Sequence, residues 1–193
     1  MAVSPSKRYM AMCERSDRAI CRVFDLSVPS FSRKKILTST DYNSKEFVSC
    51  NFAPSSEKSL LVTLTAEPDI KVIIWIWDKA KCFTFIPLQG VSGSMNATQC
   101  SFHNQDQNVV LVTGNSTYKF YRVTDNNMLQ IKHVSILKKE SHISNNYTCH
   151  TWLPDGRLLV CTDQGEIMLL EMSGEYRQLL SESPGDGFYI ECI

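Results

Sequence analysis

The chain has 193 residues, of which 43% are hydrophobic and 21% charged, a composition typical of a folded domain. Twenty lysines and arginines balance twenty aspartates and glutamates, so the formal net charge is zero. Such a chain lacks the basic excess by which proteins bind nucleic-acid phosphates or anionic membranes. We therefore expect no nucleic acid and no membrane among its partners, and the absence of net charge repulsion favours self-association.

The sequence also lacks the features of a secreted or membrane-spanning protein. Charged residues such as Lys7, Arg8 and Glu14 interrupt the N-terminal region, where a signal peptide would need an apolar core. The longest purely apolar run, 72–77, has six residues, whereas a membrane helix needs about 20. Eight cysteines occur without a secretion signal, and we expect reduced thiols in the core of a cytosolic protein.

The N-terminal half consists of two units of short strands separated by turns. The first unit, 3–40, has strands predicted at 9–13, 19–25 and 33–37, and its opening strand is missing. The second unit, 47–88, has strands predicted at 48–52, 60–65, 70–77 and 82–86. Pro54 and Pro68 mark turns in the second unit, because proline cannot donate a hydrogen bond to a strand ladder.

The C-terminal half repeats this organisation. The third unit, 97–137, has strands predicted at 98–102, 109–113, 117–123 and 128–136, and residues 132–140 also suit a short helix. The fourth unit, 147–181, has strands predicted at 147–152, 157–162, 166–172 and 176–180. Its Asp155-Gly156 turn is typical of hairpins, because glycine accepts a positive φ. The tail, 182–193, is strand-like and either begins a further unit or supplies the missing strand of the first.

The units resemble one another at a fixed spacing. Phe52, Phe102 and Trp152 lie 50 residues apart, and Cys50 and Cys100 each precede their aromatic residue by two. Four-stranded units repeating about every 40 to 50 residues are typical of β-propeller blades. A β-sandwich is the alternative, but it gives no reason for self-similarity at this length. We therefore predict an all-β fold, a partial propeller of about three and a half to four blades within a single segment, 1–193.

A dipeptide at the end of each third strand narrows the prediction. Trp77-Asp78 stands there in the second unit, and the corresponding pairs are Phe24-Asp25, Tyr121-Arg122 and Leu170-Glu171. WD40 repeats carry Trp-Asp at this place. With one matching dipeptide and no Gly-His pair, the sequence resembles a degenerate WD40 propeller.

The resemblance extends to a family of cilia- and flagella-associated WD-repeat proteins. The segments that carry it, all in the same order, are 4–11, 33–37, 45–49, 75–79, 112–115 and 165–170. Members of this family have two N-terminal propellers and a long coiled-coil tail, and they are associated with inner dynein arms. The resemblance implies a non-catalytic scaffold for ciliary motility, with axonemal proteins, inner dynein arm components and tubulin as partners. It implies a location in the cytoplasm, the cytoskeleton and the ciliary axoneme.

The chain departs from the family pattern in two ways. We expect it to start inside a blade, and it contains no heptads of a coiled coil. We therefore expect a short isoform, a fragment or a shortened homologue. Blades without neighbours leave apolar faces and strand edges open, so we predict an open arc that self-associates. The alternative function is a general cytosolic WD40-like adaptor without a ciliary role, and a third is a hydrolase using the propeller axis.

No catalytic centre is evident in the sequence. It has four histidines, of which His103 is expected in a turn or at the surface, and it has no G-x-S-x-G elbow or phosphate-binding glycine loop. Cys149, His150 and His142 come nearest to a metal site. Adjacent residues of a strand point to opposite faces, so Cys149 and His150 do not readily share one ion. We expect no catalytic residue, no cofactor and no metal.

Arg33, Lys34 and Lys35 form the candidate protein-binding site. They either solvate a strand edge and protect it from aggregation, or contact acidic tubulin tails or another axonemal partner. Trp75 and Trp77 fall on the same side of their predicted strand. In so apolar a run, we expect a buried pair rather than an exposed binding hot spot.

Overall fold

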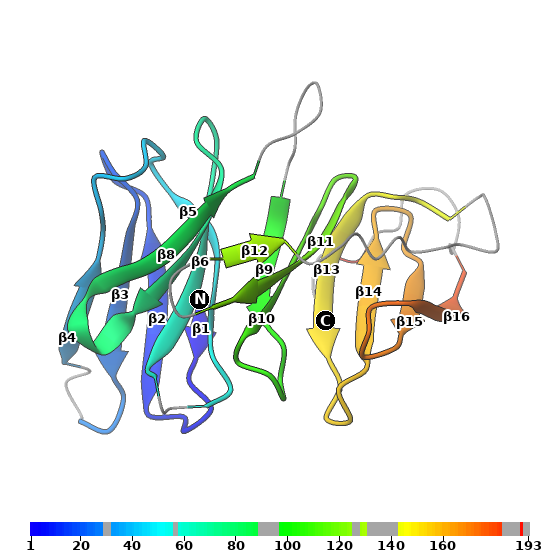
Figure 1. Cartoon of the computed structure of the whole chain (residues 1–193), viewed down its shortest axis with the longest axis horizontal. Coiled ribbons are helices and arrows are strands. Elements are labelled where there is room, and N and C mark those ends of the chain that lie inside the picture. Colours follow the sequence, from blue (N-terminus) through cyan, green and yellow to red (C-terminus); the bar gives the residue numbers. More distant parts are fainter. Residues whose placement is uncertain are drawn as a thin grey trace.

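The computed structural model describes residues 1–28, 32–55, 58–88, 97–124, 128–130, 143–182 and 190, and for residues 33 and 128–130 it describes the backbone alone. These residues form four antiparallel sheets of four strands each, and no α-helix occurs among them. Within each sheet the strands follow one another in chain order, so each sheet is a simple meander (Figure 1). The predicted all-β architecture is confirmed.

We call the sheets blades 1 to 4 in chain order. Blade 1 contains β1 (Ala2–Val3), β2 (Tyr9–Glu14), β3 (Ile20–Asp25) and β4 (Arg33–Leu37). Blade 2 contains β5 (Phe47–Phe52), β6 (Leu60–Thr65), β7 (Lys71–Ile76), the 3-10 turn η1 (Trp77–Lys79) and β8 (Lys81–Pro87). Blade 3 contains β9 (Ala97–Phe102), β10 (Val109–Gly114), β11 (Thr117–Val123) and β12 (Met128–Gln130). Blade 4 contains β13 (Tyr147–Trp152), β14 (Leu158–Thr162), β15 (Ile167–Leu170) and β16 (Tyr176–Ser181).

Two details differ from the prediction. Blade 1 does have an opening strand, β1, in which Ala2 pairs with Ala11 and Val3 with Met10. Two residues are too few to show the alternation that identifies a strand in a sequence. The strand predicted at 70–77 is β7, and Trp77 already begins the η1 turn that follows it. The helical alternative for 132–140, the end of the strand predicted at 128–136 and the tail strand lie outside the described residues, apart from residues 182 and 190.

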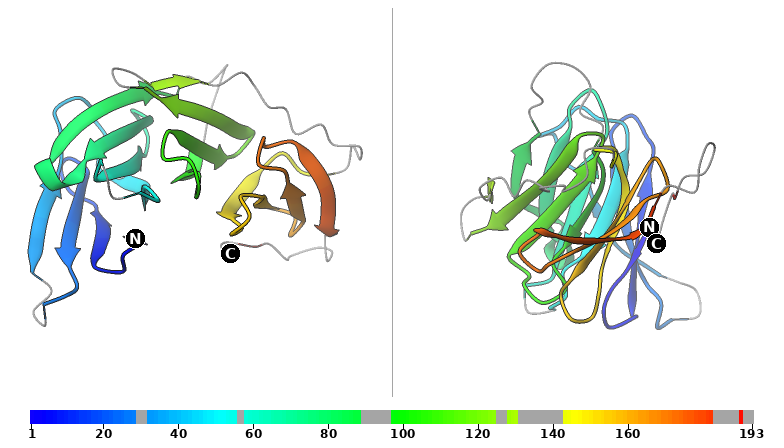
Figure 2. Two further views of the ribbon diagram at one scale, coloured as in Figure 1. Left: turned by 60° about the horizontal axis from the view of Figure 1, so that its bottom comes forward. Right: turned by 90° about the vertical axis from the view of Figure 1, so that its right-hand side faces the viewer.

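The four blades follow one another around an arc, with β4, β8, β12 and β16 on its outer side (Figure 2). Three apolar clusters hold the arc together, one between each pair of neighbouring blades. In the part of the chain that the structure describes, no core cluster joins blade 4 to blade 1. The molecule is therefore an open arc in these residues, as the sequence predicts.

The central strands of blade 2 explain why a propeller strand is apolar on both faces. Leu61, Ile73 and Trp75 belong to the cluster shared with blade 1. Val62 and Ile74, which alternate with them along β6 and β7, belong to the cluster shared with blade 3. Because successive side chains of a strand point to opposite faces, a blade with two neighbours buries both sets.

The aromatic residues that define the sequence repeat occupy the same place in three blades. Phe52, Phe102 and Trp152 end β5, β9 and β13, opposite Leu61, Val110 and Leu158. Side chains also link each of these strands to the next one around the arc. The Cys100 N–H donates to Ser49 Oγ at 3.1 Å, and the His150 N–H donates to Gln99 Oε1 at 2.8 Å. Residues that lie 50 apart in the sequence thus occupy equivalent positions in successive blades.

Candidate interaction site

The two histidines that the structure describes are parts of the core. His150 in β13 is 2% exposed, with Nε2 2.6 Å from Ser101 Oγ and Nδ1 2.8 Å from Thr113 Oγ1. Burial lowers the pKa of His150 to about 3, so its ring is neutral. A neutral imidazole bonded to two buried hydroxyls ties blade 4 to blade 3 in the core.

His103 follows β9 in the predicted turn, but its predicted surface role is wrong. The side chain is 5% exposed, and its ring lies 4.4 Å from that of Trp152 between centroids. Nδ1 accepts hydrogen bonds from the backbone N–H groups of Gln105 at 3.0 Å and Asp106 at 3.2 Å. The tryptophan of the next blade covers a residue that sequence alone places at the surface.

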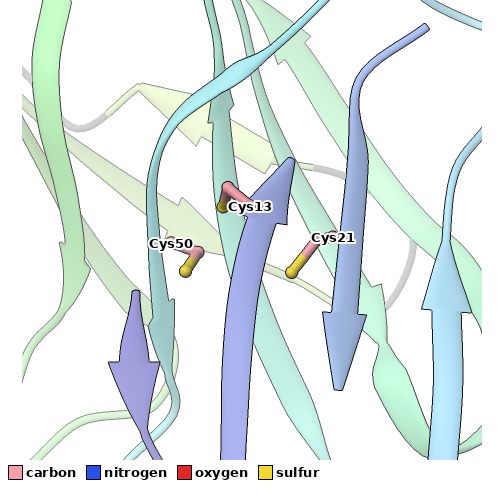
Figure 3. A group of neighbouring side chains, drawn as sticks. All are labelled: Cys13, Cys21 and Cys50. Atoms are coloured by element: carbon pink, nitrogen blue, oxygen red, sulfur yellow. The ribbon is translucent and has the colours of Figure 1, made fainter. Parts of the chain in front are cut away.

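The cysteines are reduced thiols wherever the structure describes them, and five of those seven are buried. Cys149 Sγ lies near Ile190 O at 4.0 Å, whereas His150 contacts other groups, so the two do not converge on one point. A different group does converge: the sulfurs of Cys13, Cys21 and Cys50 lie within 4.8 Å of one another (Figure 3). Sequence spacing gives no sign of this cluster, because Cys50 joins it only when blade 2 packs on blade 1.

A buried carboxylate lies beside the basic segment. Asp25, which ends β3, is 1% exposed and accepts hydrogen bonds from Ser27 Oγ at 2.6 Å and from the Ser27 N–H at 2.9 Å. Arg8 Nη2 is 3.2 Å and Lys34 Nζ 3.5 Å from Asp25 Oδ2. The hydrogen bonds from Ser27, and then that from Arg8, lower the pKa of Asp25, so its charge persists at acidic pH.

The predicted basic site, Arg33, Lys34 and Lys35, lies on β4, the outermost strand of blade 1. The β3–β4 register shifts here, since Val23 stands opposite Lys35 and Phe24 opposite Arg33, which leaves Lys34 as the extra residue of a bulge. Lys34 pairs with Asp25 within the blade, and Lys35 is half-buried. The side chain of Arg33 lies outside the described residues.

One sheet face of blade 1 is a second candidate interaction surface. On blade 1, Met12, Arg22 and Ile36 stand in one row across three strands, and Val3 pairs with Met10 on the same face. Their neighbours along β2, β3 and β4 point the other way and fill the cluster shared with blade 2. Val3 is 51% exposed, and Met12 and Ile36 are each 37% exposed. This face, which we call the free face of blade 1, combines these exposed apolar side chains with an ion pair in which Arg22 Nε lies 2.6 Å from Glu14 Oε1.

A small aromatic pocket lies on the other side of blade 1, where it meets blade 2. The pocket has a volume of about 130 Å³ and includes Tyr9, Phe52 and Trp77 in its lining. The Trp77 ring lies 4.7 Å from Tyr9 and 5.8 Å from Phe52 between centroids. Trp75 is fully buried and Trp77 half-buried in the same cluster, so the predicted pair lies on one side of the blade.

The fold defines a class of protein. The chain is a segment of a WD40-like β-propeller, and its structure is similar to a crystal structure of the Cps50 (Swd1) beta-propeller domain of Myceliophteria thermophila. That similarity has a TM-score of 0.68 at 14% identity, and it covers 90% of this chain and 52% of that domain. No helix in the described residues has the length and apolar character needed to cross a membrane.

Sequence comparison identifies the relatives. The chain is 30% identical over 178 residues to cilia- and flagella-associated protein 57 of Mus musculus, covering 92% of this chain and 13% of that protein. It is 32% identical over 166 residues to cilia- and flagella-associated protein 57 A of Tetrahymena thermophila, covering 83% of this chain and 13% of that protein. Protein 57 C of the same organism is 25% identical over 239 residues. No family model matches the chain.

These relatives confirm the resemblance to cilia- and flagella-associated WD-repeat proteins that the sequence segments indicate. The similarity runs over nearly the whole chain, whereas the chain spans only 13% of the length of the first two relatives.

Proposed function

We propose that this chain is a non-catalytic protein-interaction scaffold of the cilium. The observation that carries the proposal is the similarity to cilia- and flagella-associated protein 57 over 92% of the chain, joined to a fold built to present rigid sheet faces. Its partners are axonemal proteins, including inner dynein arm components, and it acts in arm assembly and ciliary motility at the axoneme. The whole segment, 1–193, works as one unit of about four blades.

The free face of blade 1 is the surface that supports this function best. Exposed methionine and isoleucine side chains on a regular sheet favour contact with a second apolar surface, because covering them removes apolar area from water. The same face explains the predicted self-association of the isolated chain. In the cell, an axonemal partner covers it; in purified protein, a second copy does.

Proximity labelling tests the cellular part of the proposal. The tagged chain, expressed in ciliated cells, is expected to label axonemal proteins, with inner dynein arm components among them. The variant Met12→Glu/Ile36→Glu places two charges on the free face and is expected to lose most of this labelling. Val48→Glu is the matched control, since Val48 is 45% exposed on β5, away from that face. Labelling of general cytosolic proteins in place of axonemal ones would favour the adaptor function.

Light scattering after size-exclusion chromatography tests self-association. The unmodified chain and Val48→Glu are expected to elute as concentration-dependent oligomers, and Met12→Glu/Ile36→Glu as a monomer. A monodisperse monomer of the unmodified chain that melts cooperatively would refute self-association through this face.

We also propose that the basic strand β4 contacts tubulin. Arg33, Lys34 and Lys35 follow one another on the outermost strand of blade 1, and a cationic edge suits the acidic tails of tubulin. Lys35→Glu is expected to weaken co-sedimentation with microtubules, whereas Lys45→Glu, at an exposed lysine outside β4, is not. Equal sedimentation of both variants would mean that β4 is a solvated strand edge and does not contact tubulin.

A further inference from the structure

Three thiols from three different strands meet between blades 1 and 2. Cys13 on β2 and Cys21 on β3 stand directly opposite each other in the antiparallel register. Cys50 on β5 approaches them from the neighbouring blade (Figure 3). The three Sγ atoms lie within 4.8 Å of one another, and no histidine, aspartate or glutamate among the described residues joins the group.

The cluster is largely buried, and the amino terminus lies close enough to interact with the Cys50 sulfur. Cys21 is 0% and Cys50 7% exposed, while Cys13 is half-buried. The Cys50 thiol donates one long hydrogen bond, 3.9 Å, to the carbonyl oxygen of Ala11. A thiol is a weak donor, so this contact does not by itself account for three sulfurs gathered at one point.

The sequence repeat does not impose the cluster either. The positions two residues before Phe52, Phe102 and Trp152 are Cys50, Cys100 and His150. Within the described residues, the cluster around Cys50 is the one group of three metal-ligating side chains that converges. The gathering is therefore specific to the interface between blades 1 and 2.

The spacing suits a metal ion. Metal–thiolate bonds of about 2.3 Å place three sulfurs around a central ion about 4 Å apart. The observed separations, at most 4.8 Å, come within this range after small rotations of the side chains. Soft sulfur ligands select soft, closed-shell ions, Cu(I) and Zn(II) above all.

The geometry points to a binding site for a thiophilic metal ion, held by Cys13, Cys21 and Cys50, that joins blade 1 to blade 2. Cu(I) is satisfied by three sulfurs. Zn(II) takes a fourth ligand, which solvent supplies beside the half-buried Cys13. Each thiol that binds as thiolate releases its proton to water, and no electron is transferred. This inference does not depend on the proposed ciliary function.

Metal titration of the full chain under a phosphine reductant tests the site. Co(II), as a spectroscopic substitute for Zn(II), is expected to give thiolate charge-transfer absorption that saturates at one equivalent. Cu(I) is titrated in competition with bicinchoninate, also to one equivalent. Bound ion at a large excess over its Kd is expected to raise the melting temperature by about 5 °C.

Variants assign the ligands. Cys13→Ser and Cys50→Ser are expected to weaken binding about a hundredfold or more. Cys100→Ser is the control at a buried cysteine in the equivalent repeat position, and Cys161→Ser removes one partner of the facing pair Cys149–Cys161. Both controls are expected to keep the site. Should Cys50→Ser fail to fold, the half-buried Cys13 carries the test.

The ion that saturates the site at one equivalent is the ion for which the site is built. Binding of neither ion with one-to-one stoichiometry would overturn the inference. Equal loss of binding in Cys100→Ser or Cys161→Ser would overturn it as well, because the ion would then be held by cysteines in general.

Discussion

The hydrogen bond between Trp75 and Thr63 gives the sharpest test of blade packing. Trp75 and Thr63 are both 0% exposed, and the indole N–H donates to Thr63 Oγ1 at 2.8 Å. The indole also packs edge-on against Phe47, with centroids 6.4 Å apart. Trp75→Phe keeps an aromatic ring at the blade 1–2 interface but removes the donor and part of the volume.

Two effects add up in this variant. A buried hydroxyl left without its partner costs about 1–3 kcal/mol. The smaller ring leaves unfilled space and loses apolar contact, which costs about another 1–2 kcal/mol. We expect Trp75→Phe to lower the free energy of unfolding by about 2–5 kcal/mol. Adding Thr63→Val removes the orphaned hydroxyl and is expected to restore the polar part of the loss.

Urea unfolding of the four chains of this double-mutant cycle measures the coupling. A coupling free energy of about 1–2 kcal/mol is expected between the two positions. Trp77→Phe is the matched control, because Trp77 is half-buried, and it is expected to cost less than Trp75→Phe. Strictly additive effects, or an equal loss at Trp77, would refute the assignment of Trp75 as the hydrogen-bonded anchor of this interface.

Three further predictions concern blades 3 and 4. The pKa of His150 is about 3 in the folded chain and about 6.5 in the unfolded chain, so between these values only the unfolded chain takes up the proton. The free energy of unfolding is therefore level above pH 6.5 and falls by about 2 kcal/mol by pH 5. Urea melts across this range should show that His150→Gln flattens the slope. Gly174→Ala places a Cβ 2.5 Å from Phe120 at a φ of +86°, whereas Gly156→Ala, at a φ of +88°, places one 3.0 Å from the flexible Met172. Thermal melts should show Gly174→Ala to be about 1–3 kcal/mol more destabilising than Gly156→Ala. Equal losses of stability would point to backbone strain alone. Tyr118→Phe removes the hydroxyl that donates to the carbonyl oxygen of Gly174 at 3.0 Å and should cost about 1 kcal/mol of unfolding free energy, with no change if water replaces that bond.

Sequence reasoning succeeds here where the signal is periodic. The spacing of Phe52, Phe102 and Trp152 predicts the repeat, and the run at 72–77 predicts a strand buried on both faces, because these properties follow from alternation and recurrence along the chain. The fold class follows from them. The two-residue β1 escapes detection, because a strand so short shows no alternation.

The features that the sequence does not predict share a physical cause: each depends on a contact between segments far apart in the chain. His103 is covered by Trp152 from the next blade. Lys34 turns to Asp25 at a register shift that no alternation pattern reveals. Cys13 and Cys21 face each other within one hairpin, which predicted strands could place together, but Cys50 reaches them only through the packing of blade 2 on blade 1.

The division of the core into three clusters links binding at blade 1 to the stability of the arc. Each cluster joins two neighbouring blades, so the arc is stabilised interface by interface, as in other repeat proteins. Blades 2 and 3 each belong to two clusters, whereas the end blades 1 and 4 each belong to one; blade 1 leaves Met12 and Ile36 exposed on its other side. An ion at Cys13, Cys21 and Cys50 would strengthen the interface between blades 1 and 2, and a protein on the free face would supply a further one. Because the two act on opposite faces of one sheet, each would lower the population in which blade 1 is detached and thereby favour binding of the other.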